Sequence, residues 1–152
     1  MTTCAGCRTP RRNTVSLRFC DDCLGALLAD SRRGVERWYP HPGSGALVSN
    51  LGRVRGVRGE VLKATPNGKG GYPTVTVAKR QRRAHHLVLE TYVGPRPPDC
   101  QACHYDDDPL NNRLFNVRWD WREGNEDDRR RNRLVAEVSP DMESVLSSGQ
   151  SA

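Results

Sequence analysis

The chain has 152 residues and carries 24 Lys and Arg against 18 Asp and Glu, a formal net charge of +6. Hydrophobic residues make up 36% of it and the mean hydropathy is −0.74. No apolar run approaches a membrane span, which excludes a membrane protein. We expect one ordinary domain or two mini-domains with a small core that bound metal and nucleic acid help to hold together.

Four cysteines near the N-terminus form two Cys-x-x-Cys pairs, Cys4 with Cys7 and Cys20 with Cys23. Two such pairs supply the four thiolates that tetrahedral zinc requires, and no ligand position stays open. We therefore predict a structural zinc knuckle, closed by an amphipathic helix over 21–33. Arginines in the loop suit a nucleic-acid contact, and a protein-interaction knuckle remains the alternative. The polar N-terminus lacks a signal peptide, which favours a reducing, cytoplasmic compartment without disulfides.

Short strands and one helix are predicted for the central part of the chain. A turn signal at 50–52 lies between short β-branched runs, and 72–78 alternates apolar and polar residues, so both read as strands and hairpins. Leu87, Val88 and Tyr92 fall on one helical face, which predicts a helix over 84–93 that ends at a Gly-Pro pair.

Positive charge is concentrated in the same part of the chain. Residues 31–96 contain thirteen Lys and Arg but three Asp and Glu. Such a segment favours a polyanion, and arginine suits bidentate phosphate and guanine contacts. The candidates for contact with the DNA backbone are Arg53, Arg55, Arg58, Lys79, Arg80, Arg82 and Arg83. Codon bias is the bland alternative, but the clustering argues against it as the whole account.

Three polar residues stand at intervals of twelve and nine, namely His104, Asn116 and Asn125. Residues 106–112 read as a loop, and 117–121 alternates like a short strand. Residues 123–133 have acids early and arginines late, as the helix dipole favours. The expected order is strand, loop, strand, helix. Phosphodiester hydrolysis needs a base, an orienting group and a divalent metal, and three such side chains can supply them.

This segment is similar to HNH endonucleases, whose catalytic unit is a ββα-metal motif. The resemblance extends upstream through the VSNLGRVRG and HHLV stretches and covers about 38–133. It implies that His104 is the general base, that Asn116 orients it and that Asn125 binds a divalent ion such as Mg²⁺, Mn²⁺ or Ni²⁺. It further implies a DNA endonuclease that nicks double-stranded DNA as a monomer or homodimer. A phage or mobile-element origin, and hence a bacterial host cytoplasm, goes with it.

Two residues depart from the family pattern. Cys103 stands where an Asp or His often shares the metal, and a thiolate is a poor ligand for a hard ion. Either Asn125 holds the ion with substrate phosphate, waters and Asp106, or a softer metal is used, or catalysis is weak. Asp107 occupies a position that is glycine in many members.

Alternatives from other classes follow from these departures. One is a non-catalytic DNA-binding or regulatory protein on the same scaffold. Another is zinc bound by Cys100, Cys103 and His104, which would occupy the proposed base. A third is an RNA-binding zinc protein, which the shortage of stacking aromatics disfavours.

The remaining histidines are assigned to other roles. His85 and His86 are adjacent, so on a helix they point about a hundred degrees apart and cannot easily share one ion. Packing or a phosphate contact is favoured for His85 over catalysis. His41 lies between two prolines and is expected to be exposed.

The predicted fold class is α+β. Residues 1–33 form the zinc knuckle and a short helix, and 34–133 form the endonuclease domain. Within it, 34–98 is the basic DNA-contacting region and 99–133 the ββα-metal motif. Residues 134–152 lack Lys and Arg and are expected to be a disordered tail.

Overall fold

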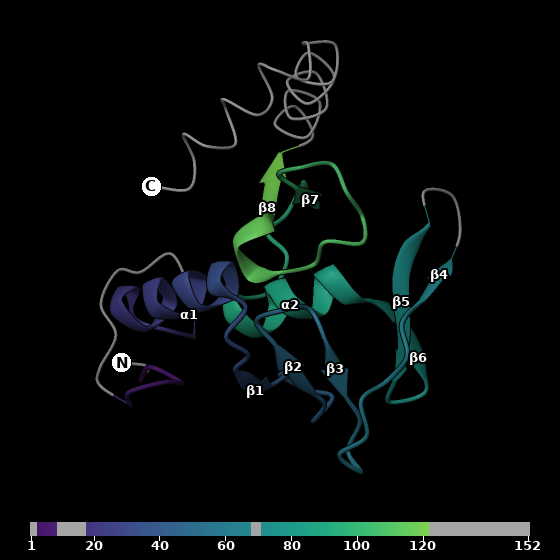
Figure 1. Ribbon diagram of the computed structural model, residues 1–152, viewed down its shortest axis with the longest axis horizontal. Helices are drawn as coiled ribbons and strands as arrows, with labels where there is room; N and C mark the ends of the chain where they lie inside the picture. Colours follow the sequence, from purple (N-terminus) through teal and green to yellow (C-terminus); the bar gives the residue numbers. More distant parts are fainter. Residues whose placement is uncertain (1–2, 9–17, 68–70, 122–152) are drawn as a thin grey trace.

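The computed structural model describes residues 3–8, 18–67 and 71–121, and within them it has an α+β fold (Figure 1). Its elements, in chain order, are α1 (Asp21–Arg33), β1 (Trp38–Pro40), β2 (Leu47–Ser49), β3 (Val54–Arg55), β4 (Thr65–Asn67), β5 (Tyr72–Val77), β6 (Arg80–Arg83), α2 (Ala84–Tyr92), β7 (Cys100–His104), the 3-10 turn η1 (Leu114–Asn116) and β8 (Val117–Trp121).

The strands form three small antiparallel sheets, ordered β1-β2-β3, β4-β5-β6 and β7-β8. The strands are short, and tight turns connect several of them. Gly52 has a φ of 90°, and Ala78 and Lys79 have φ values of 50° and 63° in the two-residue turn between β5 and β6. Successive positive φ values are typical of the turns that match the twist of a hairpin.

Helix α1 begins and ends where its sequence predicts. Asp21 and Asp22 lie in its first turn and Arg32 and Arg33 in its last, which complements the helix dipole. Gly34 follows with a φ of 77° and donates its backbone N–H to the carbonyl of Asp30, a left-handed cap that glycine adopts without steric cost.

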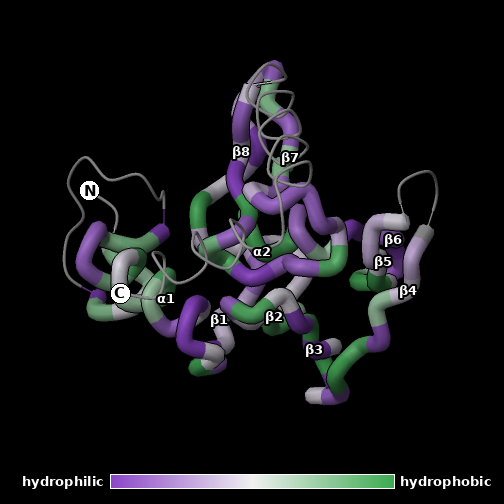
Figure 2. The backbone as a smooth tube through the Cα atoms, turned by 45° about the horizontal axis from the view of Figure 1, so that its top comes forward, coloured by the Kyte–Doolittle hydropathy of each residue, from purple (hydrophilic) through white to green (hydrophobic). Residues whose placement is uncertain are grey.

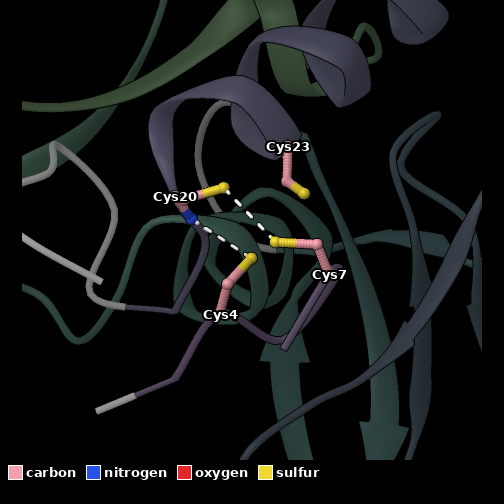
Figure 3. A group of neighbouring side chains, drawn as sticks. All are labelled: Cys4, Cys7, Cys20 and Cys23. Carbon is pink, nitrogen blue, oxygen red and sulfur yellow. Dashed lines mark hydrogen bonds between the residues drawn. The ribbon is translucent and has the colours of Figure 1, made fainter. Parts of the chain in front are cut away.

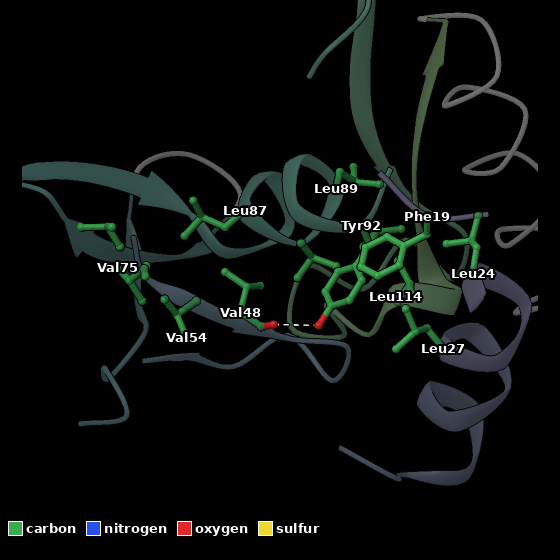
Figure 4. Close-up of a cluster of buried hydrophobic side chains, with 14 of the residues drawn as sticks. Phe19, Leu24, Leu27, Val48, Val54, Val75, Leu87, Leu89, Tyr92 and Leu114 are labelled. Atoms are coloured by element: carbon green, nitrogen blue, oxygen red, sulfur yellow. Dashed lines mark hydrogen bonds between the residues drawn. The ribbon is translucent and has the colours of Figure 1, made fainter. Parts of the chain in front are cut away.

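Helix α2 is the centre of the molecule, with the small sheets and the β7–β8 hairpin around it (Figures 1 and 4). Seven of its nine residues are buried, which is expected of a helix packed on several sides. Tyr92 donates its hydroxyl to the carbonyls of Val48 (2.7 Å) and Arg37 (3.1 Å). These bonds tie α2 to the β1–β2 sheet, and burial raises the pKa of Tyr92.

The buried cluster is continuous from the N-terminal segment to the hairpin. Phe19 is fully buried and packs on Tyr92 (5.7 Å between ring centroids) and Tyr39 (4.9 Å), and Leu114 and Val117 belong to the same cluster. The hairpin is mostly hydrophilic where it projects from the rest of the molecule (Figure 2).

Several sequence predictions are confirmed at the level of elements. The helix over 21–33 and the strand over 117–121 are present with those bounds, and 72–78 and 84–93 each end one residue earlier than expected. The predicted helix at 123–133 and the tail at 134–152 lie outside the described residues. No helix in the described ranges is long and apolar enough to cross a membrane.

Candidate active site

The β7–β8 hairpin places His104 at the edge of the core. His104 is the last residue of β7 and pairs with Val117, the first residue of β8. Its side chain is 5% exposed. Residues 105–116 form the loop that connects the two strands. The two ends of this loop are held together next to His104, because Tyr105 donates its backbone N–H to the carbonyl of Asn116 (2.8 Å).

The imidazole of His104 has its hydrogen-bond partner in Asn112. His104 Nε2 lies 2.8 Å from Asn112 Oδ1, and Asn112 is 6% exposed. An amide oxygen only accepts hydrogen bonds, so Nε2 carries the ring proton and Nδ1 keeps its lone pair. The contact therefore leaves Nδ1 as the basic atom of His104.

Asn116 has a different task from the one expected of it. Its side-chain amide donates to Asp106 Oδ1 (2.8 Å) and to the carbonyl of Asn111 (2.8 Å), and its Oδ1 accepts the backbone N–H of Asp106 (3.3 Å). The direct bond to His104 thus belongs to Asn112, whereas the buried Asn116 closes the loop that carries Asn112. The spacing of the motif does not reveal this division.

Asp106 is committed to the same loop. Its carboxylate accepts bonds from Asn116, from Asn111 Nδ2 (2.9 Å) and from the backbone N–H of Asp108 (2.9 Å). Burial raises its pKa, but these bonds outweigh burial and the pKa is lowered. Asp107 has a φ of 59°, so an aspartate adopts the conformation for which glycine is usual.

The turn at 50–52 supports the loop from the other side. Asn50 is fully buried, and its side chain accepts the backbone N–H of Arg37 (2.7 Å) and donates to the carbonyls of Val35 (3.0 Å) and Leu27 (3.3 Å). Its carbonyl accepts the backbone N–H of Leu114 (2.9 Å). The turn therefore joins α1, β1 and the loop that ends in η1.

Gly52 brings the turn into direct contact with Asn112. A Cβ at position 52 would lie 2.8 Å from both the Cβ and the carbonyl oxygen of Asn112. A side chain has no room there, so the glycine is required both for its φ of 90° and for this close approach.

A second histidine lies beside His104. The ring centroids of His85 and His104 are 4.7 Å apart, and Tyr72 stands 5.2 Å from His85 and 6.1 Å from His104. Burial, helped by the charges of His86, His104 and Arg83, lowers the pKa of His85 to about 2. His86 instead contacts Trp119 (5.6 Å), and burial first, then Arg83, lowers its pKa to about 4.

The candidate ligands of a catalytic ion do not meet at one point among the described residues. Cys103 is buried and its thiol contacts the carbonyl of Gln101 (3.7 Å). Both oxygens of Asp106 are engaged in the loop, and Asn125 lies outside the described residues. In the described ranges, Cys100, Cys103 and His104 do not form a metal-binding group. Among the described residues, these side chains do not form a donor set for a hard divalent ion.

The four N-terminal cysteines, by contrast, lie close enough together to hold one metal ion (Figure 3). The sulfurs of Cys4, Cys7, Cys20 and Cys23 lie within 4.8 Å of one another, with 3.8 Å between those of Cys7 and Cys20. Zn–S bonds of about 2.3 Å in a tetrahedron place sulfurs about 3.8 Å apart, so the donor set fits zinc.

The environment of the thiols favours a thiolate at Cys4. Burial raises the pKa of Cys4, but backbone hydrogen bonds, first from Cys20 and then from Cys7 and Gly6, lower it to about 6. Burial and the neighbouring cysteines raise the pKa of Cys23 to about 12. A bound cation would reverse the effect at Cys23, because a coordinating thiol is deprotonated.

The residues just before the second cysteine pair anchor the cluster to the rest of the chain. Arg18 donates from Nη1 to the carbonyls of Pro40 and Thr91, both at 2.9 Å. It thus joins the end of β1 to α2, next to the buried Phe19.

The seven basic candidates are not equivalent. Arg58, Lys79 and Arg80 are exposed at turns or at the start of β6. Arg53 and Arg55 lie over Trp38 (5.8 and 4.3 Å to the ring centroid), and Arg53 also pairs with Glu36.

On β6, Arg83 is exposed and lies over Tyr72 at 4.7 Å. Arg82 binds Glu90 at 2.5 and 2.6 Å, so its guanidinium is already used within the protein and its availability to DNA is reduced.

His41 is buried, contrary to the expectation of an exposed loop residue. It is 6% exposed, with Nδ1 2.6 Å from Ser44 Oγ and Nε2 2.7 Å from Glu90 Oε2. Burial raises the pKa of Glu90, but the bonds from His41 and Arg82 outweigh it and the pKa is lowered. Flanking prolines indicated a loop but carried no sign of this partner 49 residues away.

Comparison with known proteins agrees with this geometry at the level of the fold. No family model and no curated protein matches the sequence. The solved structure of the HNH homing endonuclease I-HmuI, described as a study of DNA binding and cleavage, superimposes with a TM-score of 0.55 at 20% sequence identity. The two chains share a fold over the matched residues. The match covers 74% of this chain and 66% of the HNH homing endonuclease, slightly less than two thirds of its length.

Proposed function

We propose that this protein is an HNH endonuclease that hydrolyses phosphodiester bonds of double-stranded DNA in a metal-dependent reaction. The observation that carries the proposal is the buried contact between His104 Nε2 and Asn112 Oδ1, on a hairpin of the HNH fold. A general base needs one ring nitrogen oriented by a partner and the other left to accept a proton, and this contact supplies the orientation.

In the proposed reaction His104 Nδ1 removes a proton from water as the water oxygen attacks phosphorus. The bond from phosphorus to the 3′ oxygen then breaks, the leaving 3′ oxygen takes a proton from solvent water to give a 3′-hydroxyl beside a 5′-phosphate, and His104 returns its proton to solvent. Asn112 orients the imidazole and holds its tautomer, and Asn116 and Asp106 keep the loop closed around it. A divalent ion held by Asn125 and substrate phosphate would supply charge stabilisation at the phosphate. One such centre serves one strand, so nicking is the expected activity of a monomer.

The exposed basic residues support DNA as the substrate. Arg58, Lys79 and Arg80 present their charges at turns of the strand-rich region, where phosphates can approach. Such contacts give affinity that falls with salt but little sequence specificity. The four-cysteine cluster would bind zinc and act structurally.

A non-catalytic DNA-binding protein is the second candidate, and two observations favour it. Cys103 replaces a carboxylate or imidazole ligand, and the oxygens of Asp106 are occupied within the loop. A protein of this kind would bind DNA through the same basic surface without cutting it.

Cleavage of supercoiled plasmid separates the two candidates. We expect conversion to open circles with magnesium, manganese or nickel, and at least about 100-fold slower conversion by His104→Ala, since a positioned base contributes 10²- to 10⁴-fold. Divalent ions should be withheld in the control, because a chelator would also remove zinc from the cysteines. His86→Ala is the matched control, with its ring on Trp119. A plasmid that is shifted but never cut, with any metal, would establish the non-catalytic candidate.

A further inference from the structure

His85 is a buried histidine that the proposed reaction does not yet use. It is the second residue of α2 and is 1% exposed. Buried histidines usually complete a hydrogen-bonded network, as His41 does with a partner on each ring nitrogen. His85 differs, because its Nδ1 is buried and has no hydrogen-bond partner among the described residues.

The contacts of His85 are with rings, and one of them is the proposed base. Its centroid lies 4.7 Å from that of His104, with 49° between the planes, and 5.2 Å from that of Tyr72, with 32°. Tyr72 is also stacked on His104 at 6.1 Å and 22°. Three rings, from β5, α2 and β7, therefore pack together, and the ring of His86 lies edge-on to His85 (4.7 Å between centroids, 84°).

This group restricts a motion that Asn112 alone leaves free. A hydrogen bond at Nε2 fixes one end of the imidazole of His104 but permits the ring to turn about that bond. A flat neighbour packed against the ring fixes its plane. Since α2 is buried on nearly every side, it is a rigid support for that neighbour, and catalytic groups need such support to hold productive geometry.

We propose that His85 is a positioning residue of the catalytic centre, whose ring, together with Tyr72, holds the plane of the His104 imidazole. The inference rests on the proposed function, because it requires His104 to be the base. It assigns the role to the ring face of His85 and not to its nitrogens. A buried imidazole also adds no charge beside His104 that would oppose its taking up a proton.

Four variants test the proposal in the full-length, zinc-loaded protein. His85→Phe keeps a flat ring, and we expect a single-turnover cleavage rate within a few-fold of wild type. Its melting temperature should be unchanged or higher, since an unpaired buried nitrogen is removed. His85→Ala and His85→Leu remove the ring face, and we expect rates at least about 10-fold lower with an unchanged Kd for the plasmid. Val61→Ala, at an exposed position outside the ring group, should cleave like wild type.

The outcomes distinguish the possible failures. A merely structural role would lower the melting temperature of the Ala and Leu variants while each folded molecule, counted by DNA binding, still cut at the wild-type rate, and this result would overturn the proposal. So would a Phe variant as slow as the Leu variant, because the nitrogens would then matter. Leu fills the volume, so it decides the question if Ala does not fold. A wild-type protein that binds plasmid but never cuts it would refute the proposed function itself.

Discussion

At the scale of single residues, two asparagines divide the work around His104. Asn112 touches the imidazole, whereas Asn116 contacts Asp106 and the backbone of the loop. The division has a chemical reason. The residue on the ring must offer only an acceptor to Nε2–H, whereas the residue that closes the loop must donate and accept at once, which a neutral amide does.

For the cleavage rate, the oxygen acceptor of residue 112 should therefore matter more than its amide NH2 group. We expect Asn112→Asp, which keeps an oxygen acceptor, to cleave within about 10-fold of wild type. Asn112→Leu has a similar size but leaves Nε2–H buried and unpaired, and it should cleave about 100-fold more slowly, near the lower limit of what a positioned base contributes. Single-turnover cleavage measures both, with DNA affinity as the control. Equal rates for the two variants would mean that Asn112 does not orient the base.

At the scale of elements, the turn at 50–52 supports the loop at 105–116. Asn50 reaches α1, β1 and η1 through hydrogen bonds, and Gly52 abuts Asn112. In the sequence, residues 50–52 indicate only a hairpin turn. In the structure, this turn also packs against the loop at 105–116. Its distance from His104 along the chain, more than fifty residues, hides this role from any local pattern.

Gly52→Ala tests this support, and Gly59→Ala is its matched control. Both glycines have nearly the same positive φ, 90° and 89°, but a Cβ at 59 meets nothing within 4 Å. Each variant should lose about 1–2 kcal/mol of stability from backbone strain. Only Gly52→Ala must also displace Asn112, so we expect a further fall in melting temperature and at least about 10-fold slower cleavage. Equal activity of the two variants would show that the turn does not position the loop.

Local pattern accounts for much of the fold but for less of the site. Helix α1 was predictable because acids, an apolar stripe and a left-handed glycine all mark it, and β8 because apolar and polar residues alternate. The partners of His104 were not predictable from such local patterns. His85 was assigned to packing or phosphate contact, and its approach to His104 depends on how α2 packs against the hairpin. Contacts of this kind are set by tertiary packing between segments far apart in sequence, which periodicity does not encode.

At the scale of the whole molecule, the four-cysteine cluster is part of the same core as the candidate nuclease centre. Cys4 is 1% exposed and Phe19 is fully buried against Tyr92 of α2. Arg18 ties the same segment to the end of β1 and to α2. Since α2 also carries His85, the cysteine cluster and His104 are connected through one helix. With 36% hydrophobic residues, the chain has little other core with which to replace that connection.

We therefore expect loss of the knuckle metal to destabilise the whole fold. Cys4→Ser should abolish stoichiometric zinc and lower the melting temperature by about 6–12 °C, because a loss of about 3 kcal/mol shifts the melting temperature by about 2–4 °C per kcal/mol in a chain of this size. Cleavage should fall with it even in excess magnesium. Cys100→Ser, outside the cluster, is the matched control and should keep zinc, stability and activity. Elemental analysis and thermal melts measure these effects. Were Cys4→Ser to lose zinc yet melt and cut like Cys100→Ser, the knuckle would be an independent appendage, and the path from Cys4 through Phe19 to α2 would carry no stability to the centre.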